Sequence, residues 1–283
     1  LRDKCLELQK QKIKVMAICG VAGTTETGNV DPLDAMADIA REFGAHFHVD
    51  AAWGGPTLFS RTYKHLLRGI EKADSVTFDA HKQLYVPMGV GLVVFRDPSL
   101  GSTTLEGSRP GMSMLIHSGL KILAREGYEI LIDQGIDKAK TFAEMIEAEP
   151  DFELVTRPEL NILTYRYCPE NVQEALACAD PLQAEKLNTC LNRITKFIQK
   201  TQRERGKAFV SRTRLEPARY FNFPCIVFRV VLANPLTTKE ILADILSEQR
   251  ELSRDEGIED EISILHQMAD AVLKQATPNA RQA

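Results

Sequence analysis

Three short polar segments in the first hundred residues hold the side chains best suited to chemistry in this chain of 283 residues. The segments are Gly23-Thr24-Thr25, His48-Val49-Asp50-Ala51-Ala52-Trp53 and Asp79-Ala80-His81-Lys82. Together they offer a primary amine, carboxylates, imidazoles and hydroxyls, which proteins use for acid–base and covalent catalysis. Because loops on a rigid scaffold often carry function, we take these segments as the candidate site.

Each polar segment follows an apolar stretch with the length of a β-strand. The stretches span residues 14–19, 45–51 and 75–79. A helix is expected after Asp31, which would cap it, and a second helical stretch is expected after the turn at residues 54–56, through Leu66 and Leu67. This alternation predicts a parallel sheet with helices on both faces, whose strands end at one edge. A fourth strand, over 90–96, follows too soon for a crossover helix, so we expect it to run antiparallel.

One interpretation of the second segment is a metal centre. Side chains two apart on a strand share a face, so His46, His48 and Asp50 could point together as ligands. Such a metal could activate water for hydrolysis. The sequence contains no further histidine- or glutamate-rich cluster to complete the coordination sphere, so our expectation is that no metal binds.

A lysine and an aspartate that serve one organic cofactor fit the segments better. Lys82 stands among apolar neighbours such as Phe78 and Leu84, so its amine is expected to be desolvated and reactive. Asp50, at the end of the adjacent strand, could pair with the ring nitrogen of pyridoxal 5′-phosphate (PLP) and keep that nitrogen protonated. The sequence therefore favours PLP as the cofactor.

The same residues resemble a known family. The segments 48–55, His-Val-Asp-Ala-Ala-Trp-Gly-Gly, and 73–82, Ala-Asp-Ser-Val-Thr-Phe-Asp-Ala-His-Lys, are similar to the PLP-dependent group II amino-acid decarboxylases. The resemblance extends from about Val15 to about Glu251. It implies fold type I of the aspartate aminotransferase superfamily, with a three-layer α/β/α large domain that is incomplete at its N-terminus and a small α+β domain.

The resemblance implies catalytic roles for three residues. Lys82 would carry PLP as an aldimine, Asp50 would bond the pyridine nitrogen, and His81 would lie beside the cofactor near its phosphate. Decarboxylation would then pass through a quinonoid, and Lys82 would regain the cofactor to release the amine.

The resemblance also implies that three more residues contact or orient the cofactor. Ala52 would pack under the ring, and Thr25 would approach the phenolic oxygen. His48 would orient these groups, although it could instead be an ordinary strand histidine.

Further features favour one branch of the family. The motif around Asp50 is similar to the glutamate, aspartate and diaminobutyrate branch, and residues 104–109 and 230–238 are similar to bacterial aspartate 1-decarboxylases. We expect the substrate to be an acidic amino acid, aspartate or glutamate, or diaminobutyrate. Family members form homodimers with active sites at the interface, where residues 101–109 could serve the partner's site. Arg109 could equally be a charge at the start of a helix.

The sequence departs from the family in two places. The family's large domain begins well before the residue that is Leu1 here, and the junction Leu100-Gly101 lacks a longer segment that includes a mobile loop. The missing parts normally contribute to phosphate binding, ring stacking and reprotonation. We therefore expect a chain that lacks both parts to bind PLP poorly.

The chain divides by composition into three parts. Residues 1–147 are predicted to be the C-terminal portion of the PLP-binding domain, with a largely helical stretch from 109 to 147. Residues 148–252 are predicted to form the small α+β domain, with strands over 161–167 and 226–232, a weaker strand over 208–215, a helix around 187–198 and another after Thr237. Residues 253–283 are predicted to be a peripheral helical tail.

The overall composition excludes several classes of protein. Hydrophobic residues make up 44% and charged residues 26%, as in ordinary globular proteins, and the net charge of −4 gives no footprint for nucleic acid. No apolar run is long enough to span a membrane. The six cysteines are scattered, which indicates free thiols of a reducing compartment, so we expect a cytoplasmic protein.

Three other functions remain open from the residues alone. A transaminase or an aldolase-like PLP enzyme would share Lys82 and Asp50. A metal-dependent hydrolase would use His46, His48 and Asp50. A catalytically silent scaffold would use none of them.

Overall fold

The computed structural model describes residues 1–100 and 111–276, which form two compact units that divide between Asp137 and Lys138. The division falls inside helix α4 (Met112–Glu147), and helix α8 (Glu259–Ala276) belongs to the second unit. The three-part division expected from composition stays a prediction. The expectations for residues 101–109 and for the end of the tail lie outside the described residues. No helix in the described ranges is long and apolar enough to cross a membrane.

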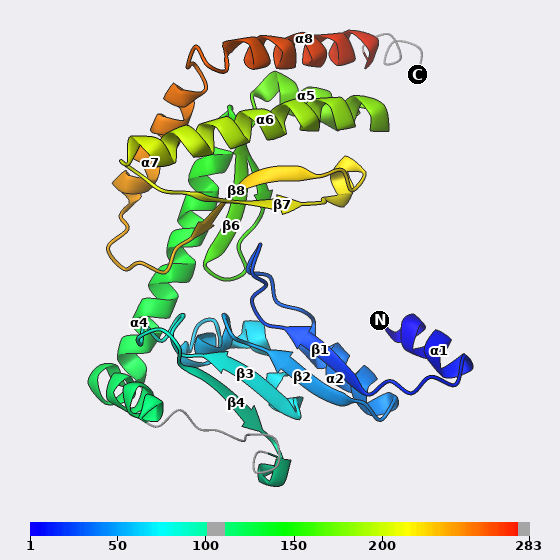
Figure 1. The fold of residues 1–283 in the computed structure, drawn as a ribbon, viewed down its shortest axis with the longest axis vertical. Coiled ribbons are helices and arrows are strands. Elements are labelled where there is room, and N and C mark those ends of the chain that lie inside the picture. Colours follow the sequence, from blue (N-terminus) through cyan, green and yellow to red (C-terminus); the bar gives the residue numbers. More distant parts are fainter. Residues whose placement is uncertain (101–110, 277–283) are drawn as a thin grey trace. The chain divides into compact units, whose positions relative to one another are not determined.

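A four-stranded sheet in the order β1-β2-β3-β4 is the centre of the first unit (Figure 1). The strands are β1 (Ala17–Val21), β2 (His46–Asp50), β3 (Ser75–Asp79) and β4 (Gly91–Phe95). The first three run parallel, and β4 pairs antiparallel with β3. The four predicted strands and their directions are therefore confirmed, although β1 begins and ends later than the predicted stretch 14–19.

The two faces of this sheet differ because side chains alternate along each strand. Helix α2 (Leu33–Glu42) joins β1 to β2, and its apolar residues share a core with Phe47 and Val49 of β2. His46, His48 and Asp50 point to the opposite face and are half-buried. A short helix α1 (Arg2–Lys10) adds Cys5 to the apolar cluster.

The segment between β2 and β3 forms three short 3₁₀ helices, where the sequence predicted an α-helical stretch. They are η1 (Gly55–Phe59), η2 (Lys64–Leu67) and η3 (Ile70–Lys72). Gly69, which precedes η3, has φ +100°, and a Cβ atom there would lie 2.2 Å from the backbone nitrogen of Asp34. The chain therefore turns tightly here to pass close to α2, and a regular helix cannot continue.

Helix α4 anchors the loop that follows β3. Its backbone departs from helical geometry at Ala124 (φ 52°, ψ −168°), so α4 consists of two helical segments. In the second segment, the Tyr128 hydroxyl donates a hydrogen bond to the Leu84 carbonyl over 3.0 Å. This bond fixes the turn that follows Lys82.

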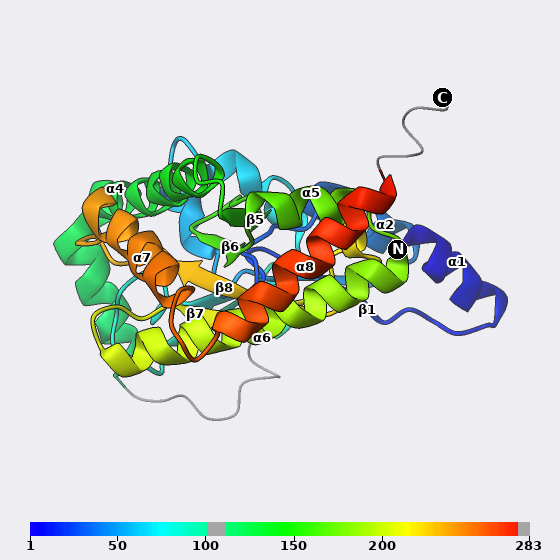
Figure 2. The ribbon, with the colours of Figure 1, turned by 90° about the horizontal axis from the view of Figure 1, so that it is seen from above.

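The second unit contains an antiparallel sheet in the order β5-β6-β8-β7. The strands are β5 (Phe152–Thr156), β6 (Ile162–Tyr167), β7 (Ser211–Leu215) and β8 (Cys225–Val231), with a one-turn 3₁₀ helix η4 (Ala218–Tyr220) between the last two. The helices are α5 (Glu170–Cys178), α6 (Pro181–Arg205), α7 (Lys239–Leu252) and α8. Helix α8 lies along α5 and α6, which separate it from the sheet (Figures 1 and 2).

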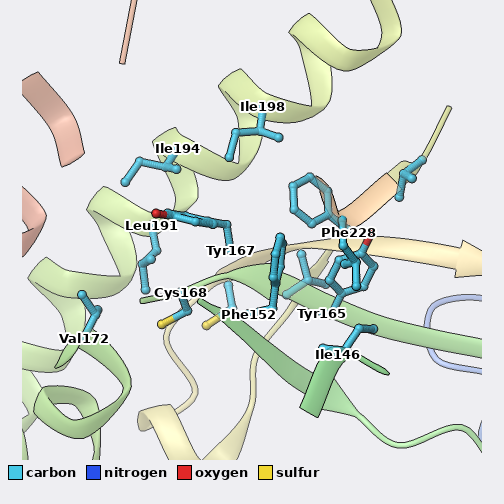
Figure 3. Packing of buried hydrophobic residues seen from close by; sticks show 14 of the residues in the cluster. Ile146, Phe152, Tyr165, Tyr167, Cys168, Val172, Leu191, Ile194, Ile198 and Phe228 are labelled. Atoms are coloured by element: carbon cyan, nitrogen blue, oxygen red, sulfur yellow. The ribbon is translucent and has the colours of Figure 1, made fainter. Parts of the chain in front are cut away.

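The core of the second unit is dense in aromatic side chains. The Tyr165 ring on β6 lies 5.4 Å from the Phe142 ring of α4 and 5.2 Å from the Phe228 ring of β8, measured between centroids. Ile194 and Ile198 of α6 pack into the same cluster (Figure 3). Leu265 of α8 is also fully buried there, so the predicted tail helix contributes to the core.

Candidate active site

Backbone hydrogen bonds join the loops that follow β1 and β2. The Ala22 amide donates to the Asp50 carbonyl over 2.8 Å, and the Gly54 amide donates back to the Ala22 carbonyl over 2.9 Å. Parallel strands bring their carboxyl ends to one edge, so the first two polar segments meet as predicted.

The loop that carries Lys82 is tied to the same edge. The Ala51 amide donates to the Thr77 carbonyl over 3.1 Å, and the Gln83 side-chain amide donates to the Trp53 carbonyl over 2.8 Å. Gln83 is almost fully buried. The structure therefore brings the three polar segments together.

Lys82 forms an ion pair with a carboxylate of its own segment. Its Nζ lies 3.0 Å from Oδ2 of Asp79, and both side chains are partly exposed. The His81 Nε2 lies 3.9 Å from the same oxygen, while its Nδ1 lies 2.8 Å from the Val90 carbonyl and donates to it. The bond to Val90 leaves Nε2 of His81 directed toward the polar cluster.

Asp50 ends β2 with its carboxylate held by the next turn. Oδ1 of Asp50 accepts a hydrogen bond from the Ala52 amide over 3.1 Å. In the sheet register Asp50 lies opposite Thr77, two residues before Asp79. The half-buried Asp50 carboxylate and the Lys82 amine therefore belong to the ends of adjacent strands.

The histidines of β2 bind hydroxyl groups of β3. The Ser75 hydroxyl lies 2.7 Å from His46 Nε2 and 2.8 Å from His48 Nδ1, and the Thr77 hydroxyl lies 3.1 Å from His48 Nε2. The two imidazoles share a face as predicted, but these bonds occupy both ring nitrogens of His48 and Nε2 of His46. In residues 1–100 and 111–276, no group of three or more His, Cys, Asp or Glu side chains could hold a metal. The geometry thus gives the metal-hydrolase interpretation no support.

Thr25 lies in an exposed turn after β1. The neighbouring Thr24 braces this turn, because its hydroxyl lies 2.8 Å from the Thr27 hydroxyl and accepts the Asn29 amide at 3.1 Å. Gly23 has φ +96°, a backbone conformation that favours glycine. The turn is therefore fixed at the edge where Asp50 and Lys82 lie.

Asp79 and Gln83 hold the lysine segment in place, although no role for either residue was predicted from the sequence. The spacing of three between Asp79 and Lys82 was a usable signal, because residues three apart meet in a tight turn. The hydrogen bond from Gln83 to Trp53 joins segments thirty positions apart, so no pattern of neighbouring residues could have predicted it.

Comparisons with known proteins show what this chain is similar to. Residues 1–106 match the pyridoxal-dependent decarboxylase conserved domain. The chain is 54% identical to aspartate 1-decarboxylase of Aliivibrio fischeri, over 96% of this chain and 53% of that protein. It is 33% identical to the probable L-aspartate decarboxylase of Pyrococcus furiosus, over 53% of this chain and 47% of that protein.

A crystal structure of mouse CSAD in apo form has the same fold as this chain. Its TM-score is 0.77 at 26% sequence identity, over 90% of this chain and 55% of that chain. The chain thus spans about half the length of the relatives that it matches.

Proposed function

We propose that this chain supplies the lysine and the ring-nitrogen partner of a PLP-dependent amino-acid decarboxylase, because it is similar to the pyridoxal-dependent decarboxylases in sequence and in fold. One observation carries the proposal. A partly exposed lysine amine and a half-buried aspartate stand at the ends of adjacent strands, in loops that hydrogen bonds join.

The donor set at this edge fits PLP. Lys82 offers a primary amine, which can react with the aldehyde of PLP. Asp50 offers a carboxylate whose direction is fixed by its hydrogen bond from the Ala52 amide. Ala52, at the start of the same loop, has a small side chain that a flat ring would approach. Bound there, PLP would supply a sink for the electrons released when the Cα–carboxylate bond breaks.

The chain's own residues then have distinct tasks. Lys82 would hold the cofactor through its amine, and a substrate amine would take the place of Lys82. Asp50 holds a proton at the ring nitrogen, because a carboxylate stabilises a neighbouring positive charge. His81, which the Val90 carbonyl orients, presents Nε2 as a hydrogen-bonding group beside the cofactor.

Three residues complete the proposed cofactor site. Ala52 packs beneath the ring, and Thr25 contacts the phenolic oxygen from its braced turn. His48 forms hydrogen bonds with Ser75 and Thr77 and so holds β2 and β3 together beside the site.

The proposed substrate is L-aspartate, which gives β-alanine and carbon dioxide. The 54% identity to an aspartate 1-decarboxylase supports it, and glutamate and diaminobutyrate are the alternatives. The test is carbon dioxide release by PLP-loaded protein from the three amino acids in parallel. We expect aspartate to be turned over fastest and Lys82→Ala to release none. Formation of a keto acid without carbon dioxide would instead identify a transaminase.

We also propose that the protein is a cytoplasmic homodimer. The six cysteines are all free thiols, as in reducing compartments. Large apolar side chains of the first unit are strongly exposed, which is common where a second chain binds; they include Met88, Met114 and Ile122. Sedimentation of the purified protein tests the dimer.

A further inference from the structure

An acidic residue, Asp79, contacts Lys82 in this structure. Its Oδ2 lies 3.0 Å from the lysine Nζ, and the exposed fraction of the Asp79 side chain is 21%. The carboxylate of Asp50 is engaged by the Ala52 amide instead. The two aspartates at this edge therefore have different partners and can have different tasks.

The position of the Asp79 side chain is fixed by its surroundings. Asp79 lies opposite Gly91 in the pairing of β3 with β4, and a Cβ atom at Gly91 would lie 3.0 Å from Oδ1 of Asp79. The Lys82 amide also donates to the Asp79 carbonyl over 3.1 Å, which closes a tight turn. The turn thus holds the carboxylate and the amine on the same side.

An ion pair of this kind affects the reactivity of the amine. An ammonium that is bound to a carboxylate has no lone pair to offer, so the pair must open before the nitrogen can attack a carbonyl carbon. The partial exposure of both groups keeps the pair weak enough to open.

We propose that Asp79 is a positioning residue, which holds the Lys82 ammonium whenever the lysine is not bonded to the cofactor. This inference rests on the proposed function. When an aldehyde arrives, the ammonium gives one proton to the Asp79 carboxylate or through it to water. The nitrogen then forms a double bond to the aldehyde carbon, and the aldehyde oxygen leaves as water. When a substrate amine displaces the lysine, Asp79 takes the regenerated ammonium back to the same place.

The test measures amine reactivity in cofactor-free protein. Brief acetylation with acetic anhydride at fixed pH, followed by peptide mass spectrometry, gives a rate for each lysine. We expect Asp79→Asn to raise the Lys82 rate on the order of fivefold, the effect of a partly exposed ion pair. Asp79→Glu keeps the charge and should restore most of the wild-type rate. If Asp79 only stabilised the fold, the Lys82 acetylation rate would not depend on whether the substituted side chain is charged.

A second ion pair in the same unit provides the control. Lys72 Nζ lies 2.6 Å from Oδ1 of Asp34, and the exposed fraction of Lys72 (29%) is similar to that of Lys82 (34%). Asp34→Asn should leave the Lys82 rate unchanged. An unchanged Lys82 rate in Asp79→Asn would overturn the inference, as would equal rises in the Asn and Glu variants.

Trapping of PLP with borohydride distinguishes this inference from the proposed function. If PLP attaches to Lys82 while Asp79→Asn acetylates at the wild-type rate, only the role of Asp79 fails. If the acetylation rates change as expected but no PLP attaches to Lys82, the proposed function fails and Asp79 still holds the ammonium.

Discussion

The two sheets of this molecule use charged side chains in opposite ways. In the first unit, Asp79 and Lys82 pair at a strand end where water still reaches both groups. In the second unit, Arg166 on β6 is fully buried, and its Nε lies 2.7 Å from Glu153 on β5. The first pair can open and exchange partners, whereas the second is enclosed by further bonds.

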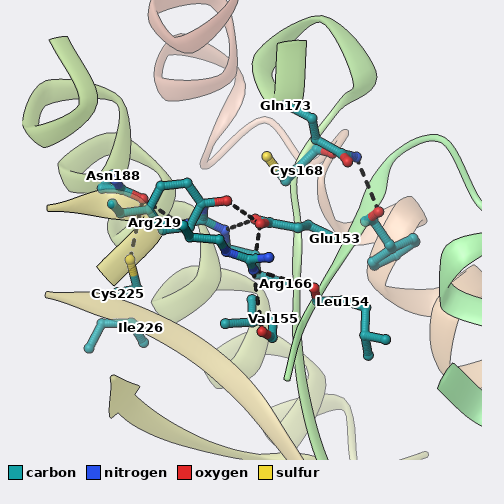
Figure 4. A network of polar contacts seen from close by, with 12 residues as sticks. Glu153, Leu154, Val155, Arg166, Cys168, Gln173, Asn188, Arg219, Cys225 and Ile226 are labelled. Atoms are coloured by element: carbon teal, nitrogen blue, oxygen red, sulfur yellow. Dashed lines mark hydrogen bonds and ion pairs between the residues drawn. The ribbon is translucent and has the colours of Figure 1, made fainter. Parts of the chain in front are cut away.

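The buried pair belongs to a network with several members (Figure 4). Arg166 also donates to Asn188 of α6 over 2.7 Å, and Arg219 lies 2.7 Å from the other oxygen of Glu153, which accepts the Tyr220 hydroxyl as well. These contacts bind Nε and Nη1 of Arg166 and offset much of the cost of burying the charges, although Nη2 of Arg166 has no hydrogen-bond partner. Both pairs are charged, but only the partly exposed pair, Asp79 with Lys82, is accessible to a reactant.

Removal of one partner from the buried network should cause the largest change in stability. Glu153→Gln leaves the Arg166 charge without its carboxylate, so we expect the free energy of unfolding to fall by about 3–5 kcal/mol. Urea unfolding measures this. Glu147→Gln is the matched control, because its pair with Arg157 is exposed and should cost less than about 1 kcal/mol. An equal loss of unfolding free energy in both variants would contradict the distinction between the buried and the exposed ion pair.

Substitution at the first sheet should affect activity and leave folding intact. Asp50→Ala removes the proposed partner of the ring nitrogen, so decarboxylation should fall by about a hundredfold or more. PLP should still attach to Lys82, with weaker retention, and the urea midpoint should change little. Wild-type turnover in this variant would refute the assignment of Asp50.

The buried network of the second unit should make the stability of the protein depend on pH in acid. Burial alone would raise the pKa of Glu153, but the charges of Arg166 and Arg219 outweigh it and hold that pKa below its ordinary value of 4.5. A lowered pKa contributes stability that is present above pH 4.5 and is lost as the pH falls through the folded-state pKa. The free energy of unfolding should therefore drop below about pH 4.5, with a smaller slope in Glu153→Gln. Identical slopes would contradict the role given to this carboxylate.

The smallest expected effect concerns the thiols. Cys19 on β1 is exposed, whereas burial raises the pKa of the Cys168 thiol to about 12. Iodoacetamide should therefore modify Cys19 in the folded chain and reach Cys168 only after denaturation. Peptide mass spectrometry gives both rates. Rapid labelling of Cys168 under native conditions would show that the reagent reaches the core of the second unit.

Much of the first unit could be predicted from sequence because its signals are local. The strand lengths and the polar segment after each strand predicted the parallel strands and the joining of the loops that carry Asp50 and Lys82 at one edge. The metal interpretation of His46 and His48 found no support, because their partners, Ser75 and Thr77, come from the next strand. Asp31 was expected to cap α2, but its carboxylate accepts the Val21 amide, and the helix begins at Leu33.

The second unit was harder to predict because its determinants are distant in sequence. Strand β5 and helix α5 gave no pattern that we recognised, and the tail expected to be peripheral packs into the core through α8. A charged residue such as Arg166 normally indicates a surface position. Its burial depends on partners distant in sequence, such as Glu153, thirteen positions before it, and Asn188, twenty-two positions after it.

The most direct test of the central claim is the attachment site of the cofactor. Protein incubated with PLP, reduced with borohydride and digested should carry a phosphopyridoxyl group on the peptide that contains Lys82. Lys72, which is similarly exposed and also paired with a carboxylate, should stay unlabelled. Label on Lys72 at the level of Lys82, or none on Lys82, would contradict the account.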